Sequence, residues 1–367
     1  MEICGVLEKN SNEPCALATV IHVEGSAYRR PGARMLITPN GHSWGMISGG
    51  CLEHDVLEQA RHVLQSGVPR VVRYDSTSND DIIFGTGLGC NGVIDVFIEP
   101  VTQHFRTAFV NAVDQCHQTR QPGAIATIVG PASTGRLTHR HAFLRAQRWT
   151  GPESLLTLLE NHLPDTDMPA IVPGITGAGE MQVFVQPLLP PLQLVVFGGW
   201  LDVMPLIRIG REIGFRVIAV DARRRESSLH SFREADSILL CSPADAVSQI
   251  KCDNRTVAVL MNHHFEGDQE ALAALTRVSI PFIGMLGPKR RQQKILEGLK
   301  NSGVQITDEF IATLHGPVGL DLGAKTPEEI ALSISAEILA VLSGRTAEPI
   351  RDRIIPAPTA PPTLAYA

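Results

Sequence analysis

Short apolar runs alternate with amphipathic segments along most of the chain. Apolar runs between turn residues predict strands, and apolar positions three to four residues apart predict helices. In the first hundred residues this pattern predicts strands at 15–23, 33–38 and 93–100. It also predicts a helix at 52–65 that ends at Gly67.

The pattern weakens in the middle of the chain. It predicts a helix at 105–116 and strands at 124–129 and 181–187. Basic residues gather here without regular spacing, which indicates a solvated surface, and we assign no site to them: Arg136, His139, Arg140, His141, Arg145 and Arg148. Pro190 and Pro191 then predict a domain boundary, because proline extends neither a helix nor a central strand.

The second half alternates strand and helix patterns regularly. Strands are predicted at 192–197, 215–221, 237–240, 256–261 and 281–286. Helical segments lie between them, and a last helix starts at Thr326 and Pro327 and ends near Gly344. This alternation predicts a parallel sheet covered on both faces, with ligand-binding loops at the carboxyl ends of its strands.

The fold class is therefore α/β, with more than one domain, because 367 residues exceed what one hydrophobic core usually supports. We predict an N-terminal α+β domain over 1–100, a weakly patterned connecting segment over 101–191 and a Rossmann-like domain over 192–345. The proline-rich tail, 346–367, is predicted to be extended or disordered. Whether the chain forms a homodimer by exchange of half-domains is left open by the sequence.

Composition and charge narrow the function classes. Hydrophobic residues make up 44% and charged residues 19% of the chain, as in soluble globular proteins. The net charge of −6 argues against nucleic-acid binding. Seven cysteines without Cys-x-x-Cys spacing indicate reduced thiols, and we predict a cytoplasmic location. Neither a secretory signal over 1–15 nor an apolar run of roughly 20 residues is present, so we expect no membrane association.

Two glycine-rich turns each deliver a cysteine. One holds Gly49, Gly50 and Cys51, and the other holds Gly89 and Cys90. Glycine lets backbone N–H groups face a ligand, so these turns predict catalytic or metal-contacting thiolates that attack, bind a metal or carry sulfur. The alternative is a small residue that fills a tight turn. The turn with Cys51 precedes the helix at 52–65, whose dipole favours a thiolate.

Polar groups near these turns suit an anion. The loop over 24–32 contains Ser26, Arg29 and Arg30, a hydroxyl and two guanidinium groups that together predict an anion-binding loop. A solvated turn is the alternative. Glu53 is either a base or an ordinary acidic residue of a first helical turn.

A glycine turn follows the first strand of the second half. Gly198 and Gly199 precede Asp221 by about 20 residues, the spacing at which an acid often binds a ribose hydroxyl. A third glycine is missing, and Trp200 stands where backbone should approach a pyrophosphate. The next residues include three arginines, Arg223, Arg224 and Arg225. They either bind a phosphorylated ligand or belong to a loop with exposed arginines.

Two further loops of this half follow predicted strands and carry candidate binding groups. His263 is adjacent to His264 at one strand end, and Lys289 and Arg290 follow another strand in a loop rich in phosphate-binding donors. We include His263, Lys289 and Arg290 among the candidate cofactor-binding residues.

Together these motifs resemble the XdhC/CoxI family, accessory factors of molybdenum hydroxylases such as xanthine dehydrogenase. The motifs that carry the resemblance are Gly25 to Gly32, Gly49 to Glu53, Gly87 to Gly92, Val220 to Arg223, Met261 to Asp268, Ile283 to Arg291 and Gly316 to Gly323. The resemblance covers about 16–100 and 194–345. The chain departs from it after Gly199, where the family normally has another glycine.

The resemblance implies a cytosolic chaperone that binds the molybdenum cofactor, supports its sulfuration and hands it to an apo molybdenum hydroxylase. It implies that Cys51 and Cys90 contact molybdenum or relay sulfur and that Arg29 and Arg30 hold the phosphate. The cytosine dinucleotide form of the cofactor and docking of a cysteine desulfurase stay open. The alternative is a nucleotide-dependent oxidoreductase or transferase that uses NAD(P) or another nucleotide, with His263 or Lys289 as acid or phosphate partner.

Overall fold

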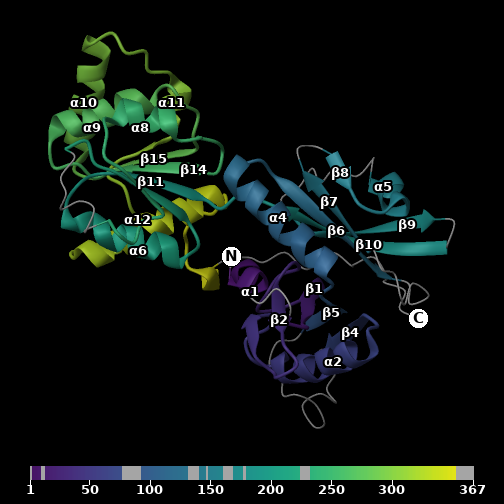
Figure 1. Ribbon diagram of the computed structural model, residues 1–367. Helices are drawn as coiled ribbons and strands as arrows, with labels where there is room; N and C mark the ends of the chain where they lie inside the picture. Colours follow the sequence, from purple (N-terminus) through teal and green to yellow (C-terminus); the bar gives the residue numbers. More distant parts are fainter. Residues whose placement is uncertain are drawn as a thin grey trace. The chain divides into compact units, whose positions relative to one another are not determined.

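The computed structural model describes most of the chain and divides it into two compact units, residues 1–190 and 191–355. The described residues are 2–9, 13–76, 92–130, 140–145, 148–159, 168–176, 179–223 and 232–352. Each unit has its own sheets and its own hydrophobic core (Figure 1).

The first half of the first unit is an antiparallel sheet with strand order β3-β2-β1-β5-β4. Its elements are α1 (Glu2–Lys9), β1 (Ala16–Gly25), β2 (Arg34–Ile37), β3 (Ser43–Gly45), α2 (Glu53–Ser66), β4 (Arg70–Asp75) and β5 (Gly92–Pro100). The helix predicted at 52–65 is α2, and Gly67 ends it in the left-handed region at φ 68°. The three predicted strands are β1, β2 and β5.

The segment that the sequence presents as a connection, 101–191, forms a second complete sheet of order β8-β7-β6-β10-β9. Its elements are α4 (Gln103–Thr119), β6 (Gly123–Gly130), β7 (His141–Arg145), β8 (Arg148–Thr150), α5 (Glu153–Leu159), β9 (Ala170–Thr176) and β10 (Gly179–Leu188). Several of these elements are too short for a clear periodic pattern, as β8 with three residues illustrates.

The two halves repeat one topology in matching register. Each runs helix, three strands, helix, two strands, and the strand orders correspond one to one. Ala16-Leu17-Ala18-Thr19 of β1 corresponds to Ala124-Ile125-Ala126-Thr127 of β6. Thr19 pairs with Phe97 and Thr127 pairs with Phe184, so Phe97-Ile98-Glu99-Pro100 corresponds to Phe184-Val185-Gln186-Pro187. We infer that the unit contains an internal duplication.

Alternation along β1 sends side chains into two different cores. Ala16, Ala18 and Val20 pack with α2 on one face of the first sheet. Leu17 and Ile21 belong to clusters on the other face, which also contain residues of the second sheet. The two sheets therefore pack against each other, with α2 on the outer face of the first and α5 on the outer face of the second.

The second unit is a parallel sheet of strand order β13-β12-β11-β14-β15-β16, the order of a dinucleotide-binding fold. Its strands are β11 (Gln193–Phe197), β12 (Arg216–Val220), β13 (Ser237–Leu239), β14 (Thr256–Leu260), β15 (Phe282–Met285) and β16 (Leu314–His315). The predicted Rossmann-like sheet is confirmed, with one more short strand, β16, than the sequence pattern shows.

Helices cover both faces of this parallel sheet (Figure 1). They are η2 (Leu201–Val203), α6 (Met204–Glu212), α8 (Pro243–Gln249), α9 (Phe265–Leu275), α10 (Lys289–Asn301), α11 (Asp308–Ala312) and α12 (Pro327–Leu342). A short helix, η3 (Ile350–Asp352), follows them and contributes to neither core cluster of this sheet. Helices α8, α9 and α10 contribute to one core cluster, and α6 and α12 contribute to the other.

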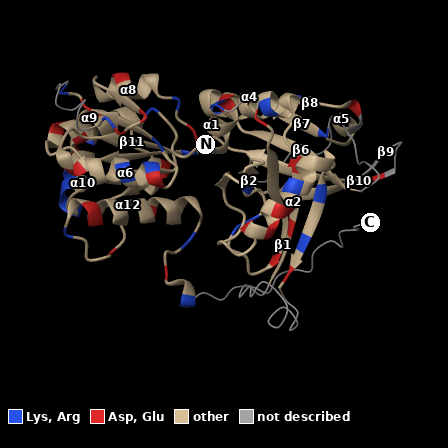
Figure 2. Cartoon of the chain, turned by 60° about the horizontal axis from the view of Figure 1, so that its bottom comes forward, with Lys and Arg blue, Asp and Glu red and all other residues tan. Residues whose placement is uncertain are grey.

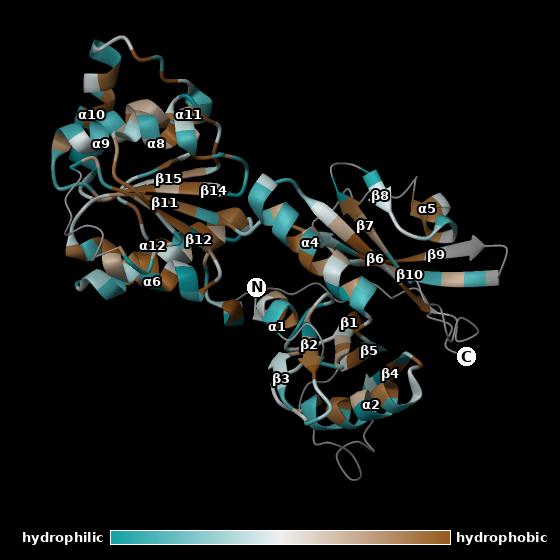
Figure 3. Cartoon of the chain, viewed as in Figure 1, coloured by the Kyte–Doolittle hydropathy of each residue, from teal (hydrophilic) through white to brown (hydrophobic). Residues whose placement is uncertain are grey.

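Charge and hydropathy follow this layering. Figure 2 shows charged residues on the helices and loops of the second unit, and strands β11, β14 and β15 carry none. The same strands are brown, hence hydrophobic, in Figure 3. Among the described residues, no helix combines the length and apolar character needed to cross a membrane.

Candidate functional site

The turn that presents Cys51 joins β3 to α2 and is held by Ser48 and Glu53. The Ser48 backbone N–H donates to Glu53 Oε1 at 2.8 Å, and the Ser48 hydroxyl donates to the other carboxylate oxygen. The Leu52 N–H in turn donates to Ser48 Oγ at 3.0 Å. Gly50 has φ 111°, a conformation that favours glycine. Cys51 is exposed and has a free thiol at the top of this fixed turn.

Glu53 is a structural anchor of the turn. Burial disfavours its charged form, but the hydrogen bonds from Ser48 outweigh burial and lower its pKa below the ordinary value. Both carboxylate oxygens are engaged by Ser48, so the geometry favours a structural role for Glu53 over a role as a base.

The arginine loop lies beside the Cys51 turn. A Cβ added at Gly49 would lie 3.5 Å from the ring of Tyr28, which belongs to the same loop as Arg29 and Arg30. Ser26, Arg29 and Arg30 are exposed. The loop's far end is fixed by Gln186 of β10, whose Nε2 donates to the Gly32 carbonyl at 3.2 Å.

The arginine loop also lies next to Gly92, the residue at which the predicted Cys90 turn joins β5. A Cβ at Gly92 would come within 2.5 Å of the Ser26 carbonyl oxygen. The Gly92 N–H donates to Ser76 Oγ at 3.1 Å. Gly89 and Cys90 themselves lie outside the described residues, so their prediction stays a prediction. The structure thus brings Ser26 close to the point where that turn joins β5.

The remaining described cysteines are buried or half-buried: Cys4, Cys15, Cys116, Cys241 and Cys252. Burial raises the pKa of Cys4 and of Cys15, which disfavours their thiolates. Within the described ranges, no group of three His, Cys, Asp or Glu side chains is arranged to hold a metal ion. Of the cysteines in these ranges, Cys51 alone is exposed.

The second predicted site lies where the parallel sheet reverses its strand order, between β11 and β14. A Cβ at Gly198 would lie 2.9 Å from the Met261 carbonyl oxygen, and one at Gly199 would lie 2.7 Å from the Asp221 carboxyl group. Gly198 therefore requires glycine because backbone of the neighbouring loop lies against it, and Gly199 leaves room for the side chain of Asp221. Ligands of such sheets bind at this reversal.

At this reversal, charged and polar side chains surround the ring of Trp200. The Arg223 guanidinium lies 5.0 Å from the Trp200 ring centroid, and the ring of His263 meets Trp200 edge-on at 5.4 Å. His263 Nε2 is 3.3 Å from Asp202 Oδ2, and Arg223 Nε is 3.4 Å from Asp221 Oδ1. The structure thus brings Asp221 and His263 to the glycine turn, as the strand ends predict.

Arg223 offers buried hydrogen-bond donors at this turn. Among the described residues, neither Nη1 nor Nη2 of Arg223 has a hydrogen-bond partner. Buried guanidinium nitrogens are normally paired, so this arrangement suits an anion. Arg224 and Arg225 lie outside the described residues.

Lys289 and Arg290 are exposed in the first turn of α10, after the next strand of the sheet. Their neighbour Arg291 has a structural role: its Nη2 is 2.9 Å from Asp268 Oδ2 and donates to the Asn262 carbonyl at 3.0 Å. Burial raises the pKa of Asp268, against the opposing effect of Arg291 and Asn262. Arg291 thereby links the loops that follow β14 and β15.

The basic cluster of the middle segment is not a solvated surface throughout. Arg140 is 8% exposed, and His141 Nε2 lies 3.0 Å from the buried carboxylate of Glu99. The expectation of a solvated cluster is wrong for these two residues, because the segment forms a packed sheet. The matching Phe-Ile-Glu-Pro and Phe-Val-Gln-Pro strands are the sequence signal that reveals this sheet. Arg136 and His139 lie outside the described residues.

Comparisons with known proteins point to one family. Residues 194–338 match the XdhC Rossmann domain, and residues 9–75 match the XdhC and CoxI family. A protein of Bacillus subtilis (strain 168), named as a probable subunit of xanthine dehydrogenase, is 32% identical, covering 89% of this chain and 93% of its own length.

Two more comparisons agree with these matches. The molybdenum cofactor insertion chaperone PaoD of Escherichia coli (strain K12) is 23% identical over 90% of this chain and 84% of its own length. A crystal structure named as a xanthine dehydrogenase from Bacillus halodurans is similar with a TM-score of 0.76 and 31% identity, covering 95% of this chain and 97% of that chain.

Proposed function

The chain belongs to the XdhC and CoxI family, and on this premise we propose that it is an accessory chaperone of molybdenum cofactor maturation. It binds the cofactor, supports its sulfuration and delivers it to a hydroxylase of the xanthine dehydrogenase type. A relative named as a molybdenum cofactor insertion chaperone supports the role in maturation. We place this activity in the cytoplasm.

One observation carries the proposal: the exposed thiol of Cys51 stands on a fixed turn beside a loop with two exposed arginines. The cargo is a pterin that carries a phosphate and a metal with affinity for sulfur. Guanidinium groups match a phosphate in charge and geometry, and a thiolate is a soft metal ligand. The residues of this region therefore fit both ends of the cargo.

Each residue of the region has a role in the proposal. Arg29 and Arg30 hold the phosphate, and Ser26 and the backbone of Gly49 and Gly50 add hydrogen-bond groups. Cys51 contacts molybdenum or carries sulfur. Gly89 and Cys90 are assigned the same roles on the second turn. The apo-hydroxylase is the partner that receives the cofactor, and a cysteine desulfurase and a second copy of this chain are further partners to test.

A nucleotide tail on the cofactor has a candidate place in the parallel-sheet unit. Gly198, Gly199, Asp221 and His263 meet at the sheet's reversal, and the unpartnered donors of Arg223 suit a phosphate. Lys289 and Arg290 add positive charge after a neighbouring strand. This arrangement supports binding of the cytosine dinucleotide form.

The test uses purified full-length protein and molybdenum cofactor released anaerobically from a donor enzyme. Gel filtration with metal analysis measures the molybdenum that elutes with the wild type, Cys51→Ala, the Arg29→Ala/Arg30→Ala double variant and a Cys241→Ala control. We expect wild type and the control to retain molybdenum and the two site variants to lose at least about tenfold in affinity, about 1.4 kcal/mol. Wild-type protein that retains none contradicts the proposal.

The second candidate is a nucleotide-dependent oxidoreductase or transferase. The strand order of the parallel sheet and the buried Asp221 beside Gly199 favour it. Trp200 opposes it, because an indole stands where a pyrophosphate needs open backbone. Titration with NADH and NADPH separates the candidates: saturable micromolar binding that Arg223→Ala weakens favours the enzyme, and its absence favours the chaperone.

A further inference from the structure

The two halves of the first unit differ at one position in a way that opens a cavity. In β2–β3 of the first half, Leu36 pairs with Trp44, and in β7–β8 of the second half, Phe143 pairs with Thr150. Leu36 and Phe143 correspond because they pair with Leu17 and Ile125. A threonine therefore occupies the register position of a tryptophan.

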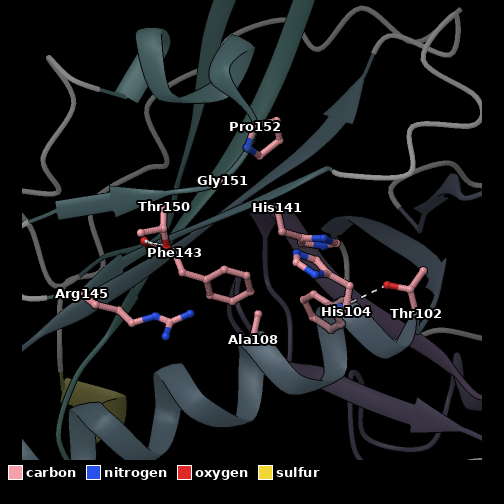
Figure 4. A pocket seen from close by; sticks show the side chains of 10 residues that line it. Thr102, His104, Ala108, His141, Phe143, Arg145, Thr150, Gly151 and Pro152 are labelled. Carbon is pink, nitrogen blue, oxygen red and sulfur yellow. Dashed lines mark hydrogen bonds between the residues drawn. The ribbon is translucent and has the colours of Figure 1, made fainter.

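Trp44 fills its position with apolar side-chain volume. It packs against a buried cluster that contains Leu7, Leu17 and Leu36. At the corresponding place beside Thr150 lies a cavity of about 410 Å³, bounded by α4, β7 and the end of β8 (Figure 4). The smaller Thr150 leaves room that the tryptophan occupies in the first half.

The cavity combines aromatic walls with positively charged or proton-donating groups. Phe105 and Phe143 line it with phenyl rings. His104, His141 and Arg145 bring ring and guanidinium nitrogens to it (Figure 4). None of the described residues that line it is acidic. Concave sites of 300–1,000 Å³ with apolar walls and a few placed polar groups are typical of small-molecule binding.

Arg145 provides the charge. Its guanidinium lies 5.7 Å from the ring centroid of Phe143, and its Nε is buried without a hydrogen-bond partner among the described residues. His141 is held in place by Glu99, 3.0 Å from its Nε2. A buried donor without an acceptor is costly unless a ligand supplies the acceptor.

We propose that this cavity binds a small organic anion that carries a flat ring. A carboxylate or phosphate of the ligand pairs with Arg145, and the ring packs against Phe105 and Phe143. This site lies in the second half of the duplicated unit. It is separate from the Cys51 turn, and its test requires no molybdenum.

Calorimetric titration of the full chain with phenyl phosphate, benzoate and inorganic phosphate tests the site. We expect saturable binding of phenyl phosphate or benzoate, at least about tenfold tighter than inorganic phosphate because the ring contributes. Arg145→Ala is expected to weaken binding about tenfold or more. Arg148→Ala removes the same charge from an exposed position of β8 and is expected to leave the affinity unchanged.

Thr150→Trp is the decisive variant, since it copies the side chain of the first half and fills the cavity. It should abolish binding and keep a cooperative unfolding transition. If this variant fails to fold, Arg145→Gln serves in its place, because it keeps much of the side-chain size and removes the charge. Absence of saturable binding of both ring compounds up to about 1 mM, or equal affinity in wild type and Thr150→Trp, overturns the proposal.

Discussion

The carboxylate of Glu53 fixes the backbone on which Cys51 is presented. It accepts hydrogen bonds from both the N–H and the hydroxyl of Ser48, and that hydroxyl oxygen accepts the Leu52 N–H. The first backbone N–H groups of a helix have no acceptor within the helix, and a side-chain oxygen such as that of Ser48 supplies one. The exposed thiol thus gains a defined direction from a neighbouring acid.

Substitution of Glu53 by glutamine is expected to lower the free energy of unfolding by about 0.5–1.5 kcal/mol at neutral pH. The pKa of Glu53 in the folded protein lies below its ordinary value of 4.5. Its contribution is therefore present above that value and is lost as the pH falls through the folded pKa. Urea unfolding of wild type and Glu53→Gln at pH 7 and at about pH 3 measures the difference.

The matched control for this pH dependence is Glu58→Gln, on the exposed side of the same helix. It should change stability little at either pH. A stability difference for Glu53→Gln that stays the same at both pH values contradicts the proposed role of its carboxylate.

Two glycines of the same region are expected to respond differently to alanine. At Gly92 the new Cβ would lie 2.5 Å from the Ser26 carbonyl oxygen and 2.7 Å from that of Glu24, so the backbone must shift. We expect Gly92→Ala to lower stability by about 1–3 kcal/mol. At Gly49 the Cβ would make an ordinary contact of 3.5 Å with Tyr28, and less than about 1 kcal/mol is expected. Thermal or urea unfolding measures both variants. An equal loss of stability in Gly92→Ala and Gly49→Ala contradicts this expectation.

At the residue scale the sequence predicted the chemistry better than the contacts. Glycine, cysteine and arginine in one region predict a thiol beside an anion-binding loop; the structure has Cys51 exposed and Gly49 next to Tyr28 of that loop, and the binding roles stay predictions. The contact of Tyr28 with Gly49, and that of Gln186 with Gly32, joins residues far apart in the chain, which local patterns do not reveal. The buried pair of Glu99 and His141 escaped for the same reason.

At the element scale the duplication organises the first unit. The long strands β1, β5, β6 and β10 were predicted, because each has eight or more residues and a run of apolar positions. The three-residue strands β3 and β8 were not, since they are too short to show a period. In the second sheet only β6 and β10 were predicted, and without β7, β8 and β9 its sequence pattern resembles that of a connection.

The duplication predicts that equivalent strands tolerate each other's residues. Leu17→Ile, Val20→Ile and Ile21→Val together give residues 16–21 the sequence of residues 124–129. The changes nearly conserve side-chain volume, so we expect a loss below about 1.5 kcal/mol for each and an unchanged fold. Circular dichroism and urea unfolding provide the measurement. Loss of cooperative unfolding in this triple variant contradicts the equivalence of β1 and β6.

At the scale of the whole molecule, two units each have a complete core. The regular alternation of strands and helices after Pro191 predicted the parallel sheet, which is confirmed, and a site at its strand ends, which stays a prediction. It did not predict how Arg223 lies over Trp200, because that contact depends on side-chain packing between two loops.

Independent cores predict independent folding. We expect residues 191–352, expressed alone, to give a soluble protein with a single cooperative unfolding transition. Thermal unfolding followed by circular dichroism measures it, and the full-length chain is the control. A fragment without a cooperative transition contradicts the independence of this unit.

We propose that this chain carries molybdenum cofactor to a hydroxylase through the Cys51 turn. The most direct measurement loads wild type and Cys51→Ala with cofactor, adds apo-hydroxylase of the xanthine dehydrogenase type and follows hydroxylase activity. We predict activity that rises with the amount of loaded wild type and is at least about tenfold lower for Cys51→Ala at equal protein. Equal activation by both proteins contradicts the role of Cys51, and no activation above free cofactor contradicts delivery itself.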